Sequence, residues 1–214
     1  MSKVIRLTAA EWADLLAGGA RGSLLLDEES RGVEATVAAM VQAPVRATLL
    51  ATAGDTGAAT RLMLSGDQVL LVTEPVSPRE GQIVASGEVQ LTFVDAAGLW
   101  PAIAAVLPGL EALRAPAVAG SGGTEIAGSP ESIEALLQGE EANLQVRVEA
   151  WPDAESASRV WGRLWSVVDG RLLDVRSSGG RLRLRERPPG AVAAELEWAL
   201  AGALAETQRP VGDH

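Results

Sequence analysis

Few residues in this sequence have side chains suited to catalysis. There is no cysteine, Lys3 is the only lysine, and the only histidine is the last residue, His214. Ser–His–Asp catalysis and zinc ligation by histidine both depend on a histidine that neighbouring elements hold in place, so we expect neither here. Without cysteine there are also no disulfides and no thiolate nucleophiles. Carboxylates are the remaining candidates.

Two short runs place carboxylates side by side: Asp27, Glu28 and Glu29, and then Glu140 with Glu141. The segment SLLLDEES around the first run resembles a Walker B strand, but the phosphate loop that this chemistry needs is absent from the sequence. Adjacent acids in turns and at helix ends are usually solvated, and neither run has the spacing of an EF-hand loop. The sequence therefore predicts no catalytic residue, no metal site, no cofactor and no enzymatic activity.

Charge and hydropathy limit the class of protein further. The chain has 214 residues, of which 47% are hydrophobic, and a net charge of −10. It can bury a core, but it lacks the basic surface of a nucleic-acid binder. No apolar run reaches the ~20 residues of a membrane span, and the first residues lack the apolar centre of a secretory signal. We expect a soluble cytoplasmic protein that neither binds nucleic acid nor inserts into a membrane.

The charge is unevenly distributed along the chain. Between residues 144 and 187 there are nine arginines and six carboxylates, a net charge of +3, so the rest of the chain carries −13. An uneven distribution of this kind can steer a protein partner toward one part of the surface.

The order of predicted elements repeats along the chain. After a first helix at residues 8–16 and a short strand at residues 22–27, the pattern helix, four strands, helix occurs twice. The helices of the two copies are predicted at residues 33–44, 99–107, 129–139 and 191–206.

Local signals mark where two of these helices begin. Thr8 followed by Glu11 predicts a capping box. Ser129 followed by Pro130 predicts an N-cap and a proline in the first turn. Two-residue turns at residues 66–67 and 169–170 predict hairpins.

The expected fold class is α+β: two quasi-symmetric α-β-β-β-β-α units share a central twisted antiparallel sheet of about eight strands, flanked by helices. Residues 1–214 form one domain, with the first unit at about residues 29–114 and the second at about residues 129–206. The Gly-, Ser- and Ala-rich residues between them, at about 115–128, are expected to be a flexible linker. Their glycines lack the spacing and context of a dinucleotide site.

Alternation along the strands of the second unit predicts which residues face the helices. The apolar set expected there is Val146, Val148, Val160, Leu164, Leu173, Val175, Leu182 and Leu184. The opposite side, which we name the arginine–tryptophan face, would carry Arg147, Glu149, Trp151, Arg159, Trp161, Arg163, Trp165, Arg183 and Arg185.

The arginine–tryptophan face has three interpretations. A helix, or the loop after Glu74, could cover Trp161 and Trp165, with the arginines extending to the edge. The face could instead be uncovered and bind a protein, because Trp and Arg often anchor interfaces, or it could stack on a ligand. The candidate partner-binding residues are Trp161, Trp165, Arg159, Arg163, Arg147, Arg183, Arg185 and, on the last helix, Trp198.

Four segments carry a resemblance to a known family: LTAAEWADLL, VRATLLATA, LWPAIAAVLPGL and DGRLLDVRSSGGRLRLRERPPGAVAAELEWALAGAL. In their order and hydrophobic pattern they resemble the EspG-type chaperones of actinobacterial type VII (ESX) secretion, and the resemblance covers nearly the whole chain. No catalytic-style motif accompanies it, and the chain is shorter than typical members.

The resemblance implies two quasi-symmetric halves around one antiparallel sheet, and a cytosolic chaperone without enzymatic activity. It implies a helical secreted partner of the PE–PPE or WXG type, which binds the sheet surface and the C-terminal helical part. The alternative is a stand-alone scaffold or immunity-type module with an unrelated protein partner.

Overall fold

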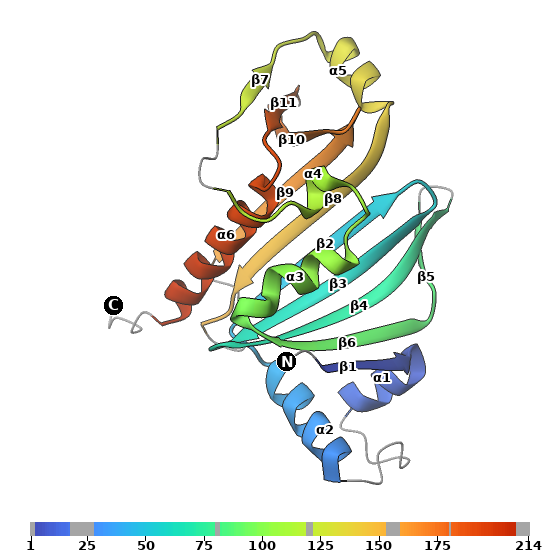
Figure 1. The fold of residues 1–214 in the computed structure, drawn as a ribbon, viewed down its shortest axis with the longest axis vertical. Helices are drawn as coiled ribbons and strands as arrows, with labels where there is room; N and C mark the ends of the chain where they lie inside the picture. The colour runs from blue at the N-terminus through green and yellow to red at the C-terminus, as the bar shows by residue number, and fades with distance from the viewer. Residues whose placement is uncertain are drawn as a thin grey trace.

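The computed structural model describes residues 3–17, 28–79, 82–118, 122–152, 159–179 and 181–208. It confirms the α+β class: one large antiparallel sheet carries helices on both faces (Figure 1). The strands are β1 (Lys3–Thr8), β2 (Val45–Ala53), β3 (Thr56–Ser65), β4 (Gln68–Arg79), β5 (Gln82–Ala85), β6 (Glu88–Asp95), β7 (Thr124–Ile126), β8 (Glu140–Ala150), β9 (Arg159–Val168), β10 (Arg171–Ser178) and β11 (Arg181–Arg187). The helices are α1 (Ala9–Leu16), α2 (Glu28–Met40), α3 (Leu99–Val106), α4 (Glu111–Arg114), α5 (Pro130–Leu137) and α6 (Ala191–Thr207), with a 3₁₀ turn, η1 (Ala96–Gly98), before α3.

The two halves of the chain meet in the middle of the sheet. The strand order is β1-β6-β4-β3-β2-β8-β9-β10-β11-β7, and β5 pairs with β4. At the centre β2 pairs with β8, with Val45 opposite Ala150 and Thr52 opposite Asn143. Hydrogen bonding is therefore continuous from one half to the other.

The elements follow the same order on both sides of the β2–β8 pair. Outward from β2 the sheet adds β3, β4 and β6, and outward from β8 it adds β9, β10 and β11. Strands β1 and β7 form the two edges. This order is compatible with two quasi-symmetric units, whereas the duplication of the sequence and its unit boundaries stay predictions.

Several elements differ from the sequence-based expectation. The structure adds β1, β5, β7 and α4, and β4 continues to Arg79 where a loop after Glu74 was expected. Residues 115–128, expected to be a linker, include β7, in which Ile126 pairs with Leu184 of β11. The strand expected at residues 22–27 lies outside the described residues.

The predicted helix starts are confirmed in atomic detail. Glu11 N–H donates to Thr8 Oγ1 at 3.2 Å, and Thr8 N–H donates to Glu11 Oε2 at 2.6 Å. The Glu11 carboxylate accepts hydrogen bonds from the Thr8 backbone N–H and, at 2.9 Å, from the Thr8 hydroxyl, and these two, the backbone one first, hold the pKa of Glu11 below its usual value. Ser129 caps α5 in the same way, with Pro130 in its first turn.

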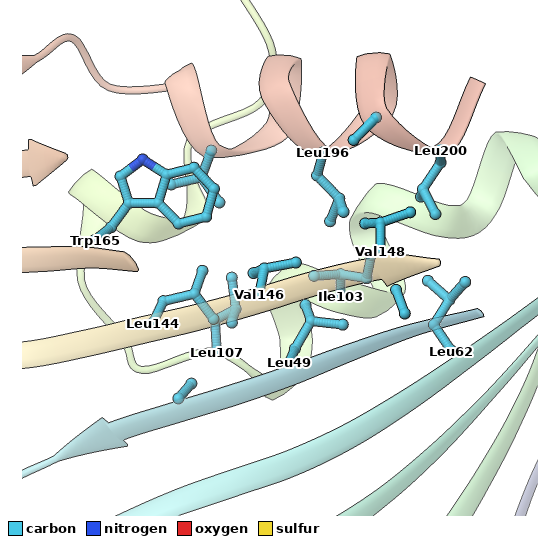
Figure 2. Close-up of a cluster of buried hydrophobic side chains, with 14 of the residues drawn as sticks. Leu49, Leu62, Ile103, Leu107, Leu144, Val146, Val148, Trp165, Leu196 and Leu200 are labelled. Carbon is cyan, nitrogen blue, oxygen red and sulfur yellow. The ribbon is translucent and has the colours of Figure 1, made fainter. Parts of the chain in front are cut away.

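One face of the sheet carries the main core. Helices α3, α4 and α6 pack on this side, which we name the helix-covered face (Figure 1). Leu49 of β2, Val146 and Val148 of β8 and Leu196 of α6 lie together in this core (Figure 2). The cluster includes residues from both halves of the chain, so it joins them by packing as well as by hydrogen bonds.

The opposite face carries two smaller clusters, one toward each end. Helices α1 and α2 cover the first, which includes Trp12, Met40 and Leu70. Helix α5 covers the second, in which Ile133 packs with Leu184. In the middle of this face Thr48 of β2 and Gln145 and Arg147 of β8 are exposed, and Leu50 of β2 is half-buried.

Candidate functional site

The arginine–tryptophan face is not a single surface in the structure. Trp165 of β9 points toward α6, on the helix-covered face (Figure 2), and Trp161 packs against the same core cluster. Trp165 is 0% exposed, and Trp161 is half-buried against it, with ring centroids 6.1 Å apart. Leu164, expected to face the helices, is instead 39% exposed on the opposite side. The expected orientation of β9 is therefore wrong.

Packing against α6 explains this orientation. A tryptophan ring buries ~150–250 Å², so turning it inward removes much more apolar surface from water than burying Leu164 would. Helix α6 contributes small side chains, Ala191, Ala199 and Ala203, to the core cluster that contains Trp165.

The other apolar positions of the second unit divide between the two faces. Val146 and Val148 face the helices as predicted. Leu173 and Leu184 are buried against α5 on the opposite face, with Val175 half-buried beside them. Leu182 was expected to face the helices and is 38% exposed, and the side chain of Val160 lies outside the described residues.

Two arginines hold α6 on the sheet through one carboxylate. Glu195 of α6 pairs with Arg163 of β9, Nε to Oε2, at 3.3 Å, and with Arg187 of β11, Nη2 to Oε1, at 2.5 Å. The Arg163 guanidinium also lies 5.2 Å from the centroid of the Trp161 ring. The Arg187 side chain is only 4% exposed, a buried role that sequence alternation did not identify. Arg163 and Arg187 therefore attach a helix in this structure.

The remaining predicted contact residues are scattered. Arg147 lies on the open side of the sheet, and its side chain is 61% exposed. Arg183 and Arg185 are exposed on β11, in register with positions of the helix-covered face. Trp198 is 60% exposed on α6. The side chain of Arg159 lies outside the described residues.

The middle of the sheet remains accessible on the side opposite α6. A row with two leucines crosses it in register, from Leu50 of β2 through the polar Gln145 of β8 to Leu164 of β9. A polar row beside it runs from β3 to β9, each residue directly opposite the next: Arg61, Thr48, Arg147 and Gly162. We name these two rows the central open face. Because its residues alternate with core residues, they point away from α3, α4 and α6.

Gly162 is the residue of this face that the fold explains least. Glycine weakens a strand interior, and it often marks a place where another backbone or a ligand approaches closely. A Cβ built on Gly162 would meet only the carbonyl oxygen of Val146, at 3.5 Å, which is an ordinary contact. Its φ is not positive either. Nothing within the described chain therefore requires glycine here.

A small polar network lies beside the central open face. Arg147 Nε lies 2.5 Å from Glu149 Oε1, and Trp151 Nε1–H donates to Glu149 Oε2 at 3.2 Å. Arg46 stacks over the Trp151 ring at 4.7 Å from its centroid. These contacts orient Arg147, whereas Arg61 forms no ion pair within the described part of the chain.

The carboxylates singled out in the sequence have structural contacts. Glu140 accepts hydrogen bonds from Asn143 and from the Ser166 hydroxyl, and Glu141 accepts one from the Gly170 N–H at 2.9 Å. Asp27 lies outside the described residues, as do the side chains of Glu28 and Glu29. No group of three potential metal ligands occurs among the described residues.

Surface hollows lie away from these carboxylates. One of about 420 Å³ lies between α3 and strands β1 and β6, and another of about 580 Å³ extends from β1 to Pro75. Both include Gln90 in their lining. Among the described helices, none is long and apolar enough to cross a membrane.

Comparison with known proteins supports the fold. No family model matches the sequence, and no curated protein matches it in a sequence comparison. Among solved structures, the chain resembles the type VII secretion system chaperone EspG5 of Mycobacterium tuberculosis, solved in complex with a PE25–PPE41 dimer. The likeness covers 99% of each chain, with a TM-score of 0.50 and 12% sequence identity.

A second solved structure, described as a "putative adenylate cyclase" from Bacillus halodurans, has 9% identity and a TM-score of 0.18, over 99% of this chain and 92% of the other. A score that low carries no argument. The similarity to EspG5 shows that the two chains share a fold, in agreement with the resemblance found in the sequence.

Proposed function

We propose that this protein is a cytoplasmic, non-enzymatic chaperone of a type VII secretion system, which binds a helical secreted protein and keeps it soluble for export. The fold shared with EspG5 over 99% of both chains supports the class of function. The observation that carries the proposal is the central open face, a part of the sheet that helices on either side leave exposed.

The chemistry of the central open face suits the end of a helix. Leu50 and Leu164 provide apolar contact, and Gly162 of β9, which has no side chain, lets a client backbone come close. Beside them Arg61 supplies positive charge that no ion pair within the described residues offsets, and Arg147, paired with Glu149, presents its exposed guanidinium as a hydrogen-bond donor. The C-terminal end of a helix carries partial negative charge on its free carbonyl groups, so we propose that the client docks with that end.

This site retains Arg147 from the sequence-based set and adds residues that the set did not contain. Trp198 belongs to α6, which packs on the opposite face, so it does not contact the same helix end. Trp165 does not contact the client, because its side chain is fully buried on the other face of β9; it contributes by packing β9 against the core.

Direct binding tests the proposal. Purified protein is titrated with PE–PPE-type dimers and WXG-type proteins from the same genome, and the dissociation constant is measured for wild type and for Gly162→Val. A valine Cβ fits the strand, so the variant should melt at the wild-type temperature or above, since glycine in a strand is unfavourable by roughly 0.5–1 kcal/mol relative to alanine. Its side chain should nevertheless weaken client binding at least tenfold, about the effect of losing a central contact.

A matched pair of substitutions controls for general surface effects. Leu164→Asp places a charge in the central open face and should weaken binding. Val84→Asp alters another exposed apolar strand residue, on β5, and should not. Failure of the wild type to bind any of these client classes contradicts the proposed function. Equal binding by wild type and Gly162→Val contradicts the site.

A further inference from the structure

The helix-covered face of the second half carries a group of arginines beyond the N-terminal end of α6. Arg176 of β10 lies directly opposite Arg183 of β11, and Arg185 lies opposite Asp174. Arg176, Arg183 and Arg185 are all exposed. Like charges at directly opposed positions of an antiparallel pair destabilise the sheet, so Arg183 lowers the stability of the isolated protein.

The neighbouring carboxylates compensate this group only in part. Asp174 is fully buried and binds Arg176, Oδ2 to Nη2, at 2.6 Å, and this hydrogen bond raises the pKa of Arg176. Glu195 is shared by Arg163 and Arg187. Arg185 lies opposite Glu125 of β7 and donates to the Gly123 carbonyl at 3.1 Å. Arg183 forms no ion pair within the described residues. Three arginines therefore meet two carboxylates, Asp174 and Glu125, and the uncompensated positive charge lies at Arg183.

We propose that Arg176, Arg183 and Arg185 form a second docking surface, which binds an acidic segment of a partner protein. Charge complementarity is the argument, because these cations stand out on a chain of net charge −10. That same net charge repels a long polyanion such as nucleic acid, whereas a short acidic segment contacts the arginines alone.

The spacing of the three arginines fits such a segment. Neighbouring strands lie ~4.8 Å apart, and residues two apart along one strand are ~6.8 Å apart. Carboxylates four residues apart on a helix have Cβ atoms separated by ~5–6 Å, so two of them can each meet an arginine. This surface lies opposite the central open face, so it does not depend on the proposed client site.

Fluorescence anisotropy with a defined probe tests the inference. The probe is a fluorescein-labelled helical peptide with glutamates at i, i+4 spacing, compared with the same peptide carrying glutamines. Wild type should bind the glutamate peptide, more weakly as salt rises, and should not bind the glutamine peptide. Arg183→Glu should weaken binding at least tenfold. It should also raise the melting temperature, because it replaces the Arg176–Arg183 repulsion with attraction.

The control variant is Arg79→Glu, which reverses an exposed strand arginine at the end of β4. It should change neither peptide binding nor the melting temperature. The inference is overturned if wild type does not bind the glutamate peptide, if Arg79→Glu loses binding equally, or if the melting temperature of Arg183→Glu is no higher than that of wild type. Single-stranded DNA of matched charge that binds more tightly than the peptide also overturns it.

Discussion

Trp165 shows why alternation along a strand does not by itself identify the buried side. Both faces of β9 carry large apolar side chains, Trp161 and Trp165 on one and Leu164 on the other. Alternation therefore shows which residues share a face, but not which face is buried. Which side is buried is decided by α6, which follows in sequence and packs in the same core cluster as the two tryptophans. Counting the area that each residue type can bury would have favoured the tryptophans.

Substitution of Trp165 gives the prediction at the scale of a single residue. Trp165→Ala should lower the free energy of unfolding by about 3–5 kcal/mol, because it removes a large, fully buried ring and leaves a cavity. Urea denaturation followed by circular dichroism measures the change. Trp198→Ala is the control: its side chain is 60% exposed, so the loss should stay below about 1 kcal/mol. Equal losses in both variants would contradict the assigned burial.

Whole elements were predictable where their signals are local. The capping box at Thr8 and the N-cap at Ser129 depend on hydrogen bonds between residues three apart in sequence, and both are present. The two-residue turn at Asp169 and Gly170, both with positive φ, joins β9 and β10 as a hairpin should. Strands β1 and β7 escaped prediction because each is a short edge strand whose pairing partner is distant in sequence.

The attachment of α6 gives the prediction at the scale of an element. Glu195→Gln removes the carboxylate shared by Arg163 and Arg187 and leaves the buried guanidinium of Arg187 without a counter-charge. Breaking a buried pair by removing one partner is strongly destabilising, so we expect a loss of about 3–5 kcal/mol in the free energy of unfolding.

The matched control for this loss is Glu197→Gln on the exposed side of the same helix, which should change stability by no more than about 0.5 kcal/mol. Chemical denaturation measures both variants. A small effect of Glu195→Gln would show that α6 is held by its apolar contacts alone.

At the scale of the whole molecule, the sequence indicated two similar halves but not how strongly they depend on each other. In the structure two features join the halves: the β2–β8 strand pair, and α6, an element of the second half that also packs on β2 of the first. The main core cluster contains Leu62 and Leu71 from one half and Leu144 and Leu172 from the other. Such long-range contacts leave no signal in the local periodicity of either half.

Because they share a core, the two halves should unfold together. If either half opened alone, the other would expose the apolar side chains that face it, so strands β3 and β9 should open only with the whole protein. Native-state hydrogen exchange followed by mass spectrometry should then give β3 and β9 the same opening free energy, equal to that from urea denaturation. Strand β5, exposed and paired only with β4, should exchange faster through local opening. A lower opening free energy for β9 than for β3 would mean that the second half unfolds by itself and that the β2–β8 pair does not couple the two.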